Sequence, residues 1–286
     1  MTMPTILSCT DGSVYSNSVY DHSAWAAGRM QARVRVLHLL DPRRDRPLNT
    51  DLSGAIGVDA QKKLTEELVA LEEAKGRVAQ TKAQAILTAA RARLGAAGVA
   101  EVVTEARHGS LAESIESLEA GADLVVIGKR GESADFARLH LGANPERVIR
   151  SCHHPVLVAS RAFKPIERML IAYDGGPSAK KAVAYAAEQP LLRGLQCHLL
   201  TVGPPNAALD SGLAEARAVL ASAGYAVQAD HLPGHAEEVI AQTVKREQTD
   251  LLVMGAYGHS RIRQFIVGST TTTMVRTCLI PVLMFR

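Results

Sequence analysis

Residues 249–258 read TDLLVMGAYG and residues 122–131 read ADLVVIGKRG, so one pattern occurs twice at an offset of 127. In both copies four consecutive apolar residues are followed by a glycine. A strand that is apolar on both faces is typical of a parallel sheet covered by helices on both sides. The repeat therefore predicts two α/β units of the same kind in one chain.

Two more landmarks repeat on either side of this pattern. HPVLVA at 154–159 matches IPVLM at 280–284 at an offset of 126, and ILSCTDGS at 6–13 matches MLIAYDGGPS at 169–178 at an offset of 163. The difference between the offsets 163 and 127 means that the first half holds 36 more residues between its landmarks. We place this surplus in residues 41–76, which have no counterpart in the second half.

The landmarks divide the chain into a first domain, residues 1–162, and a second domain, residues 163–286. The first domain contains an insertion at 41–97, in which prolines and glycines predict a loop over 41–59. The rest of the insertion is rich in Ala, Lys, Glu, Leu and Gln, which favours one long helix or two. We interpret the insertion as an elongated surface helix; the alternative is a lid or a partner-docking arm over the cleft of the first half.

Short apolar runs alternate with longer amphipathic ones in both halves. The expected strands are 5–10, 34–40, 99–106, 123–128, 155–160, 168–173, 196–202, 225–232, 250–255 and 281–285. The expected helices are 14–32, 60–97, 110–121, 144–152, 177–192, 207–223, 235–247 and 269–278. This order predicts two doubly wound α/β domains, each with a five-stranded parallel sheet. Exposed strand edges invite pairing, and 155–160 and 281–285 end their halves.

The composition narrows the class of protein. Hydrophobic residues make up 47% and charged residues 21%, which excludes a disordered chain, and a net charge of +3 excludes a dedicated nucleic-acid binder. The absence of an apolar run of 18 residues predicts no membrane span, and the first residues show no secretory signal. The four cysteines are scattered, so we expect a reducing, cytoplasmic setting rather than structural disulfides.

The glycines of the second half suggest an anion site. Gly255 and Gly258 are followed by nine residues and then by Gly268, Ser269 and Thr270. Ligands of open α/β sheets bind beyond the carboxyl ends of the strands, and a helix N-terminus favours a phosphate. Neither a Walker A motif nor a Gly-x-Gly-x-x-Gly fingerprint is present.

With these residues in place, the chain resembles a tandem universal stress protein, with two such domains covering nearly all of it. The family's nucleotide signature is Gly, two residues, Gly, nine residues, Gly, then Ser or Thr, and the second half matches it in full. The resemblance implies an adenine nucleotide alpha hydrolase-like fold and ATP as the ligand, often with Mg²⁺ or Mn²⁺ on the triphosphate.

The resemblance also assigns residues to the second-half site. Asp174 ends the first strand of that half and corresponds to the residue that contacts adenine, with Ala172 and Tyr173 beside it. Val202 ends the next strand and corresponds to a residue that borders the base. Met254 and the glycine loop correspond to the part that holds ribose and phosphates, with His259 nearby. The family's last strands pair between subunits, and a tandem chain can make this pairing internally as a pseudo-twofold unit; a further homodimer is left open.

The first half departs from the signature. Gly128 and Gly131 are followed by ten residues rather than nine, and Gly142 is followed by Ala143 and Asn144, so the hydroxyl side chain is lost. A lost hydrogen bond to a charged phosphate costs about 1.5–3 kcal/mol. We therefore expect a weaker or differently selective site there, or none.

The first half still has candidate residues at the ends of its first two strands. Thr10 and Asp11 stand at the end of the first strand, and Leu39 stands near the end of the second. Lys129 and Arg130 could compensate by charge, although solvation of both side chains is the simpler interpretation.

No residue is assigned as a catalytic group or as a metal ligand. His153 and His154 lack a carboxylate or thiolate at ligand spacing, and a Pro-Gly pair separates His231 from His235, so both pairs are interpreted as loop or surface histidines.

Three hypotheses for the function follow. The first is a cytoplasmic stress-response protein that binds ATP in the second domain and acts as a sensor or regulator rather than an efficient catalyst. The second is a slow ATPase or autophosphorylating enzyme that uses Mg²⁺ at the same loop. The third is an interaction scaffold that binds no nucleotide.

Overall fold

The structure is a computed structural model that describes residues 3–40, 58–129, 143–256 and 269–286. Its strands are β1 (Thr5–Thr10), β2 (Arg33–Leu40), β3 (Val102–His108), β4 (Leu124–Gly128), β5 (Val156–Ala159), β6 (Arg168–Ala172), β7 (Gln196–Val202), β8 (Val227–Leu232), β9 (Leu251–Gly255) and β10 (Val282–Phe285). Its α-helices are α1 (Ser16–Met30), α2 (Val58–Ala96), α3 (Leu111–Leu118), α4 (Ala143–Ser151), α5 (Pro177–Glu188), α6 (Ala207–Ser222), α7 (Ala236–Arg246) and α8 (Ser269–Thr277). Short 3-10 helices cover Glu119–Gly121 and Pro190–Leu192. These bounds confirm the predicted order of strands and helices to within a few residues.

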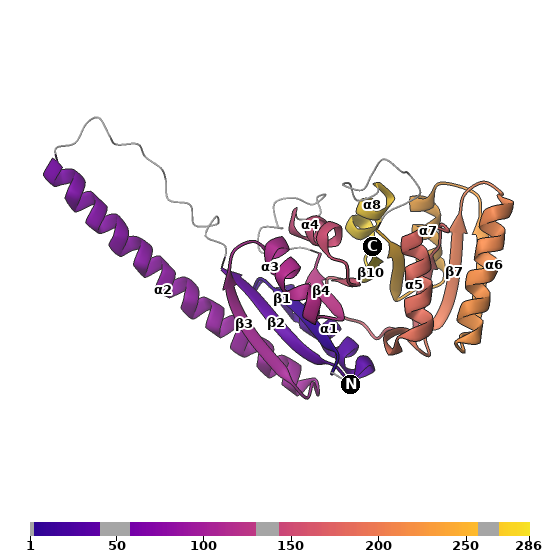
Figure 1. The fold of residues 1–286 in the computed structure, drawn as a ribbon, viewed down its shortest axis with the longest axis horizontal. Helices are drawn as coiled ribbons and strands as arrows, with labels where there is room; N and C mark the ends of the chain where they lie inside the picture. Colours follow the sequence, from indigo (N-terminus) through magenta and orange to yellow (C-terminus); the bar gives the residue numbers. More distant parts are fainter. Residues whose placement is uncertain (1–2, 41–57, 130–142, 257–268) are drawn as a thin grey trace.

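All ten described strands belong to one sheet, in the order β3-β2-β1-β4-β5-β10-β9-β6-β7-β8. The order is symmetric about its centre, because each strand of the first half has its repeat at the mirrored place in the second. Within each half every pairing is parallel, as the apolar repeat predicted. The doubly wound fold is therefore confirmed in both halves (Figure 1).

Two apolar layers cover the two faces of this sheet. One layer joins the sheet to α1, α2, α5 and α6, and the other joins it to α3, α4, α7 and α8. Successive side chains of a strand point into opposite layers. For example, Ile6 and Leu7 of β1 are both almost fully buried and lie in different layers. Burial on both faces explains why the central strands are continuous apolar runs.

The two halves join through β5 and β10, which pair in the antiparallel direction with Leu157 opposite Leu283. Both leucines are fully buried and belong to one apolar cluster that contains residues of both halves. The expected pairing of 155–160 with 281–285 is thus confirmed, and neither strand is an edge of the sheet.

Polar contacts also cross between the halves. The Arg29 side chain donates to the backbone carbonyls of Leu191 and Arg193. Lys129 Nζ donates to the carbonyl of Ile280 at 2.9 Å and to that of Cys278. Charged side chains that donate to carbonyls of the other half fix the orientation of the two domains.

His22 lies at this junction and is fully buried. Its Nδ1 is 2.6 Å from the carbonyl oxygen of Ser18, its ring packs edge-on against Phe163 at 5.0 Å, and its Nε2 has no partner among the described residues. Burial lowers the pKa of His22 by disfavouring the imidazolium. The folded protein therefore holds His22 neutral at a pH at which the unfolded chain already binds a proton.

We expect acid to destabilise the protein through His22. An unfolded histidine titrates near about pH 6.5, so the stability that neutral His22 contributes is present above that pH and is lost below it. One proton gives a slope of at most about 1.4 kcal/mol per pH unit. In thermal unfolding from about pH 7 to about pH 5, His22→Gln should flatten the decline. His108→Gln, which changes an exposed side chain, should keep the wild-type decline, and an unchanged slope in His22→Gln would refute the assignment.

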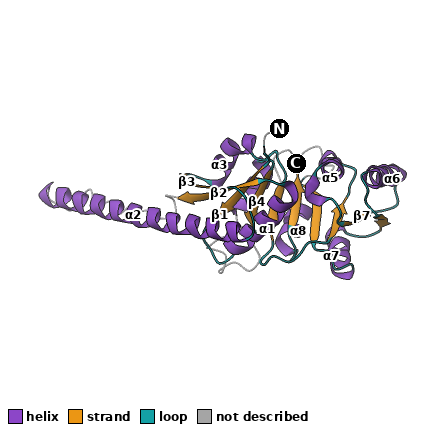
Figure 2. Ribbon diagram, turned by 90° about the horizontal axis from the view of Figure 1, so that it is seen from below, coloured by secondary structure: helices purple, strands orange, loops and turns teal. Residues whose placement is uncertain are grey.

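The insertion forms one helix of 39 residues, α2, rather than two. Its C-terminal part packs on α1, β2 and β3, and Arg93 makes two 2.8 Å hydrogen bonds to the Asp21 carboxylate. Its N-terminal part extends beyond the sheet (Figures 1 and 2). The prediction of a long helix in the insertion is confirmed. Most of the predicted loop at 41–59 lies outside the described residues.

All four cysteines are free and buried. Burial raises the pKa of Cys9, Cys152 and Cys197 to about 12, and it also raises that of Cys278. These thiols therefore stay protonated in the folded chain, which fits their interpretation as small core residues.

Candidate functional site

The candidate site of the second half lies where β6, β7 and β9 end. Ala172, the last residue of β6, pairs with Met254 of β9 on one side and with Leu200 of β7 on the other. The chain leaves β6 toward β7, whereas β9 is reached later from the other direction, so this point is a topological switch. Ligands of open parallel sheets bind in the crevice at such a point.

Asp174 follows β6 and closes a tight turn. Its Oδ1 accepts a hydrogen bond from the backbone N–H of Gly176 at 2.9 Å. Gly175, between them, has a φ of +74°, a left-handed conformation that favours glycine. The turn holds the Asp174 carboxylate at the strand end, at the start of α5.

Apolar side chains at the neighbouring strand ends belong to the second apolar layer. Ala172 and Val202 are partly buried and pack against that layer, and Met254 is buried within it. All three therefore lie on one face of the sheet at its carboxyl edge. Such a surface next to a carboxylate suits a flat heterocycle that carries hydrogen-bond donors.

Tyr173 faces the other way. Its side chain is 4% exposed and belongs to the first apolar layer, and its hydroxyl approaches Gly212 of α6. Burial raises the pKa of the phenol. The expected place of Tyr173 in the site is thus confined to its backbone, because side chains alternate between the faces of a strand.

Gly255 ends β9 and allows a close helix contact. A β-carbon built there would lie 2.9 Å from Cβ of Ser178 and 3.3 Å from the backbone nitrogen of Ala179. The sequence placed this glycine in the nucleotide signature. The structure adds a different reason for it, which is that the first turn of α5 packs directly against the strand end.

Thr271 is a site-edge residue that sequence reasoning missed. It is buried, and its Oγ1 lies 3.3 Å from the carbonyl oxygens of both Gly255 and Ala256. This side chain ties the first turn of α8 to the end of β9. The sequence has threonine at four consecutive positions, 270–273, and only the helix orientation decides which one faces inward.

Most of the glycine loop lies outside the described residues. Gly258, His259 and Gly268 lie outside the described residues. Ser269 and Thr270 form the start of α8, as expected, and Thr270 is partly exposed. The described part of the site thus consists of the three strand ends, the Asp174 turn and the N-terminus of α8.

Comparison with known proteins decides the family. A model of the universal stress protein family matches residues 3–160 and again residues 165–286. The chain belongs to the universal stress protein family. The two matches show that it carries the family's domain twice, as the resemblance implied.

Similar proteins cover either the whole chain or about half of it. The universal stress protein Slr1230 from Synechocystis is 40% identical over 289 residues, which cover 99% of this chain and 100% of that protein. The crystal structure of a universal stress protein from Archaeoglobus fulgidus covers 99% of this chain and 96% of its own, with a TM-score of 0.67 and 21% identity. A universal stress protein solved in complex with cAMP covers 56% of this chain and 98% of its own, with a TM-score of 0.37 and 24% identity.

The first universal stress protein domain repeats the turn but not the whole site. Asp11 Oδ1 accepts from the N–H of Ser13 at 3.0 Å and from the Ser16 hydroxyl at 3.2 Å, and Gly12 has a φ of +76°. Thr10 is buried, with its Oγ1 2.9 Å from Ser16 Oγ and 2.7 Å from the Tyr20 hydroxyl. The expected contact of a ligand with Thr10 is thus limited to its backbone, because α1 engages its hydroxyl.

Of the five other residues expected at the first-domain site, the structure describes three. Leu39 is partly buried against the second apolar layer, as Val202 is in the other half, and Gly128 ends β4 beside Ala159 of β5. Asn144 lies in the first turn of α4. Gly131 and Gly142 lie outside the described residues.

Two features set the first domain apart. A β-carbon built on Gly12 would lie 2.3 Å from Cδ1 of Ile86, so the insertion helix rests on the Asp11 turn. Lys129, which was expected to be solvated or to compensate by charge, instead contacts carbonyls of the second half. The contact of Ile86 with the Asp11 turn and the contacts of Lys129 with the second half therefore distinguish the first domain from the second.

The histidine pairs form no cluster. Among the described residues, no group of three or more His, Cys, Asp or Glu side chains could hold a metal ion. His153 is largely exposed and lies beside Glu119, as expected for a surface histidine. The expectation of a loop or surface position was wrong for His231. His231 lies in β8, and its side chain is 12% exposed. Its Nδ1 is 2.6 Å from Oδ1 of Asp210, because the side chain is directed from the edge strand toward α6.

Among the helices that the structure describes, none combines the length and the hydropathy that a membrane crossing requires.

Proposed function

We propose that this universal stress protein binds ATP in its second domain and acts in the cytoplasm as a nucleotide-dependent regulator of the stress response. The observation that carries the proposal is the Asp174 turn at the switch point between β6 and β9, followed in sequence by the complete glycine signature. The carboxylate provides an acceptor for the amino group of adenine, and Ala172, Val202 and Met254 provide an apolar surface for the ring.

The described residues fit such a ligand. The site offers a carboxylate, an apolar border and a helix N-terminus at one edge of the sheet, and these suit a base, a ribose and a phosphate chain in turn. Mg²⁺ or Mn²⁺, when present, would be held mainly by phosphate oxygens, because no cluster of metal-ligating side chains exists among the described residues.

Regulation rather than turnover agrees with the groups at this site. Asp174 is engaged in its turn, where its Oδ1 accepts the hydrogen bond of the Gly176 N–H, and recognition of a base is the simplest role for a carboxylate held in this way. Binding of ATP would instead stabilise one arrangement of the domain, by about 2.7 kcal/mol at a ligand concentration of 100 times the dissociation constant.

The decisive experiment replaces Asp174. We expect Asp174→Ala to weaken ATP binding by about 10- to 100-fold in isothermal titration, because a hydrogen bond to a charged group contributes about 1.5–3 kcal/mol. Asp11→Ala, the same change in the first domain, should leave the tighter binding event unchanged. Equal ATP affinity in wild type and Asp174→Ala would overturn the proposed site, and cAMP titrated in parallel would identify a different nucleotide preference.

The two other hypotheses have separate outcomes. A slow ATPase or autokinase would release or transfer phosphate at a rate abolished by Gly268→Val. An interaction scaffold would show no thermal shift with millimolar ATP and no nucleotide after native purification and denaturation. About one ATP per chain would support one competent site, and about two would show that Ala143 does not disable the first domain.

A further inference from the structure

The N-terminal half of α2 is exposed or half-buried from Lys62 onward. From Lys62 to Lys82 none of the described side chains is buried, and burial begins only at Ala83. These 21 residues extend about 30 Å at 1.5 Å per residue. Most helical stability in proteins comes from the packing of an apolar face, so a helix of this length calls for a partner along this half.

An apolar stripe runs along this half of α2. Leu64, Leu68, Leu71 and Val78 recur at intervals of four, three and seven residues, and Ala85 continues the row. Leu68, Leu71 and Val78 are 47%, 50% and 69% exposed. Apolar residues at this spacing are typical of the a and d positions of a heptad, which form the contact line, or seam, between the helices of a coiled coil.

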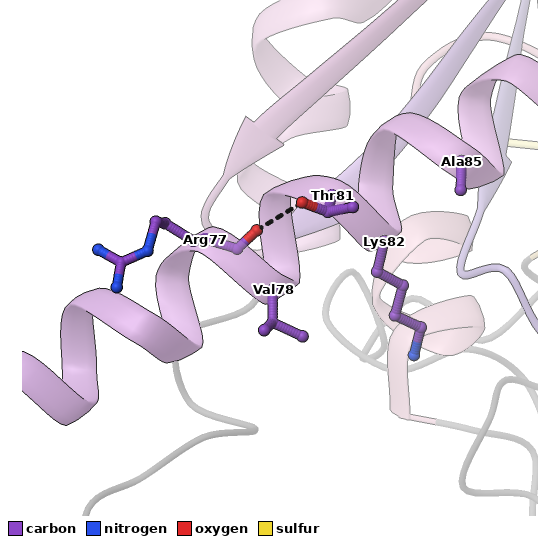
Figure 3. A pocket seen from close by; sticks show the side chains of 5 residues that line it. All are labelled: Arg77, Val78, Thr81, Lys82 and Ala85. Atoms are coloured by element: carbon purple, nitrogen blue, oxygen red, sulfur yellow. Dashed lines mark hydrogen bonds between the residues drawn. The ribbon is translucent and has the colours of Figure 1, made fainter.

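The stripe differs from the face that α2 uses within its own domain. The buried residues among the described side chains of α2 are Ala83, Leu87, Ala90 and Leu94, which form a separate row at intervals of four, three and four residues. The helix therefore has two apolar faces, of which one is already packed. Figure 3 shows Val78 and Lys82 directed to the same side of α2, where with Ala85 they line a shallow pocket.

Charge is distributed unequally along α2. Residues 66–73 contain four glutamates and no lysine or arginine, whereas residues 74–96 contain five basic residues and no acidic one. The two stretches meet at ion pairs of the same helix, Lys75 with Glu72 at 3.0 Å and Arg77 with Glu73 at 3.9 Å.

We propose that α2 is a dimerisation arm that pairs in the antiparallel direction with α2 of a second copy of this chain. An interface between two identical copies about a twofold axis uses the same surface twice, so that surface must complement itself. With the axis near residue 74, the acidic stretch of one helix lies along the basic stretch of the other, and the two stripes meet. A parallel pair would instead place the glutamates against each other, which is unfavourable.

The mass of the full chain tests the pairing. In analytical ultracentrifugation over a range of concentrations we expect the wild type to approach twice its chain mass of 30.5 kDa. Leu68→Ser combined with Leu71→Ser should raise the dissociation constant by at least about tenfold, because two apolar side chains per chain leave the seam. Val219→Ser is the matched control, since it changes an exposed apolar side chain on α6 and should leave the dimer intact.

Far-UV circular dichroism at high dilution separates loss of pairing from loss of the domain. A monomeric double variant with an unchanged melting temperature of the globular part supports the arm. A wild type that stays at 30.5 kDa at every concentration overturns the proposal, and so does a double variant that dimerises as well as the wild type.

Disulfide trapping tests the direction. The native cysteines are all buried, so an intermolecular disulfide is expected to form only between cysteines introduced on α2. Glu67→Cys mixed with Thr81→Cys should cross-link on mild oxidation, whereas each variant by itself should cross-link poorly. Efficient cross-linking of each variant by itself, with no cross-link between the two different variants in the mixture, would show a parallel pair and refute the antiparallel arrangement.

Discussion

Leu157→Ala should lower the free energy of unfolding by about 2–5 kcal/mol, the range for a large side chain removed from a packed core. Leu157 is fully buried, lies opposite Leu283 across the antiparallel junction, and belongs to the apolar cluster that contains residues of both halves. The cavity would open where the two sheets join, so we expect both domains to lose stability together. Chemical denaturation followed by fluorescence and by circular dichroism measures the change.

Leu279→Ala provides the matched control for this effect. Leu279 is 90% exposed and lies four residues before Leu283, so its replacement should change the stability by no more than about 0.5 kcal/mol. A double-mutant cycle of Leu157→Ala with Leu283→Ala should show a coupling energy of about 0.5 kcal/mol or more, because the residues are direct neighbours. Strict additivity would contradict the junction described here.

Gly255→Ala should destabilise the protein by about 1–3 kcal/mol, the usual cost of overpacking. The added β-carbon would meet Cβ of Ser178 and the backbone nitrogen of Ala179, and a backbone atom at the start of a helix cannot move aside as a flexible side chain can. The first turn of α5 must therefore shift, and the Asp174 turn before it must shift too. Thermal unfolding measures the first effect, and the ATP affinity measures the second.

Gly28→Ala is the opposite case in the same chain. Gly28 lies inside α1, and a β-carbon there would meet no atom within 4 Å. Alanine should stabilise the helix by about 0.5–1 kcal/mol, because it restricts the unfolded chain and causes no clash. If both alanine variants changed the stability in the same direction, the close contact at Gly255 would not be the cause.

The fold could be predicted from local patterns in the sequence. The apolar runs before Gly128 and Gly255 and the two Asp-Gly turns repeat at fixed offsets, and a repeat of this kind specifies the order of strands and helices without any knowledge of contacts. The insertion helix could be predicted for a similar reason, because helix formers dominate residues 60–97. The strand ends at Asp11 and Asp174 were placed correctly since period and turn chemistry are local properties.

The direction of individual side chains at the site required the structure. Thr10 and Tyr173 were expected beside a ligand, yet both side chains face the helices that cover the sheet. The Thr10 hydroxyl lies 2.7 Å from that of Tyr20 in α1, and the Tyr173 hydroxyl approaches Gly212 in α6. Thr271 became recognisable only once the orientation of α8 was known. A strand alternates its side chains between two faces, and a short apolar run does not reveal which face each residue takes.

The sequence by itself determined that this protein is two repeated doubly wound domains, with a complete nucleotide signature in one of them and a long helix inserted in the other. Only the tertiary structure decided the register in which β5 and β10 join the two sheets, that α2 rests on the Gly12 turn through Ile86, and that Lys129 reaches the second half. The physical reason is that periodicity and turn chemistry are encoded within a few residues. These three contacts instead join residues 74 to 151 positions apart, and their existence depends on how the finished elements pack.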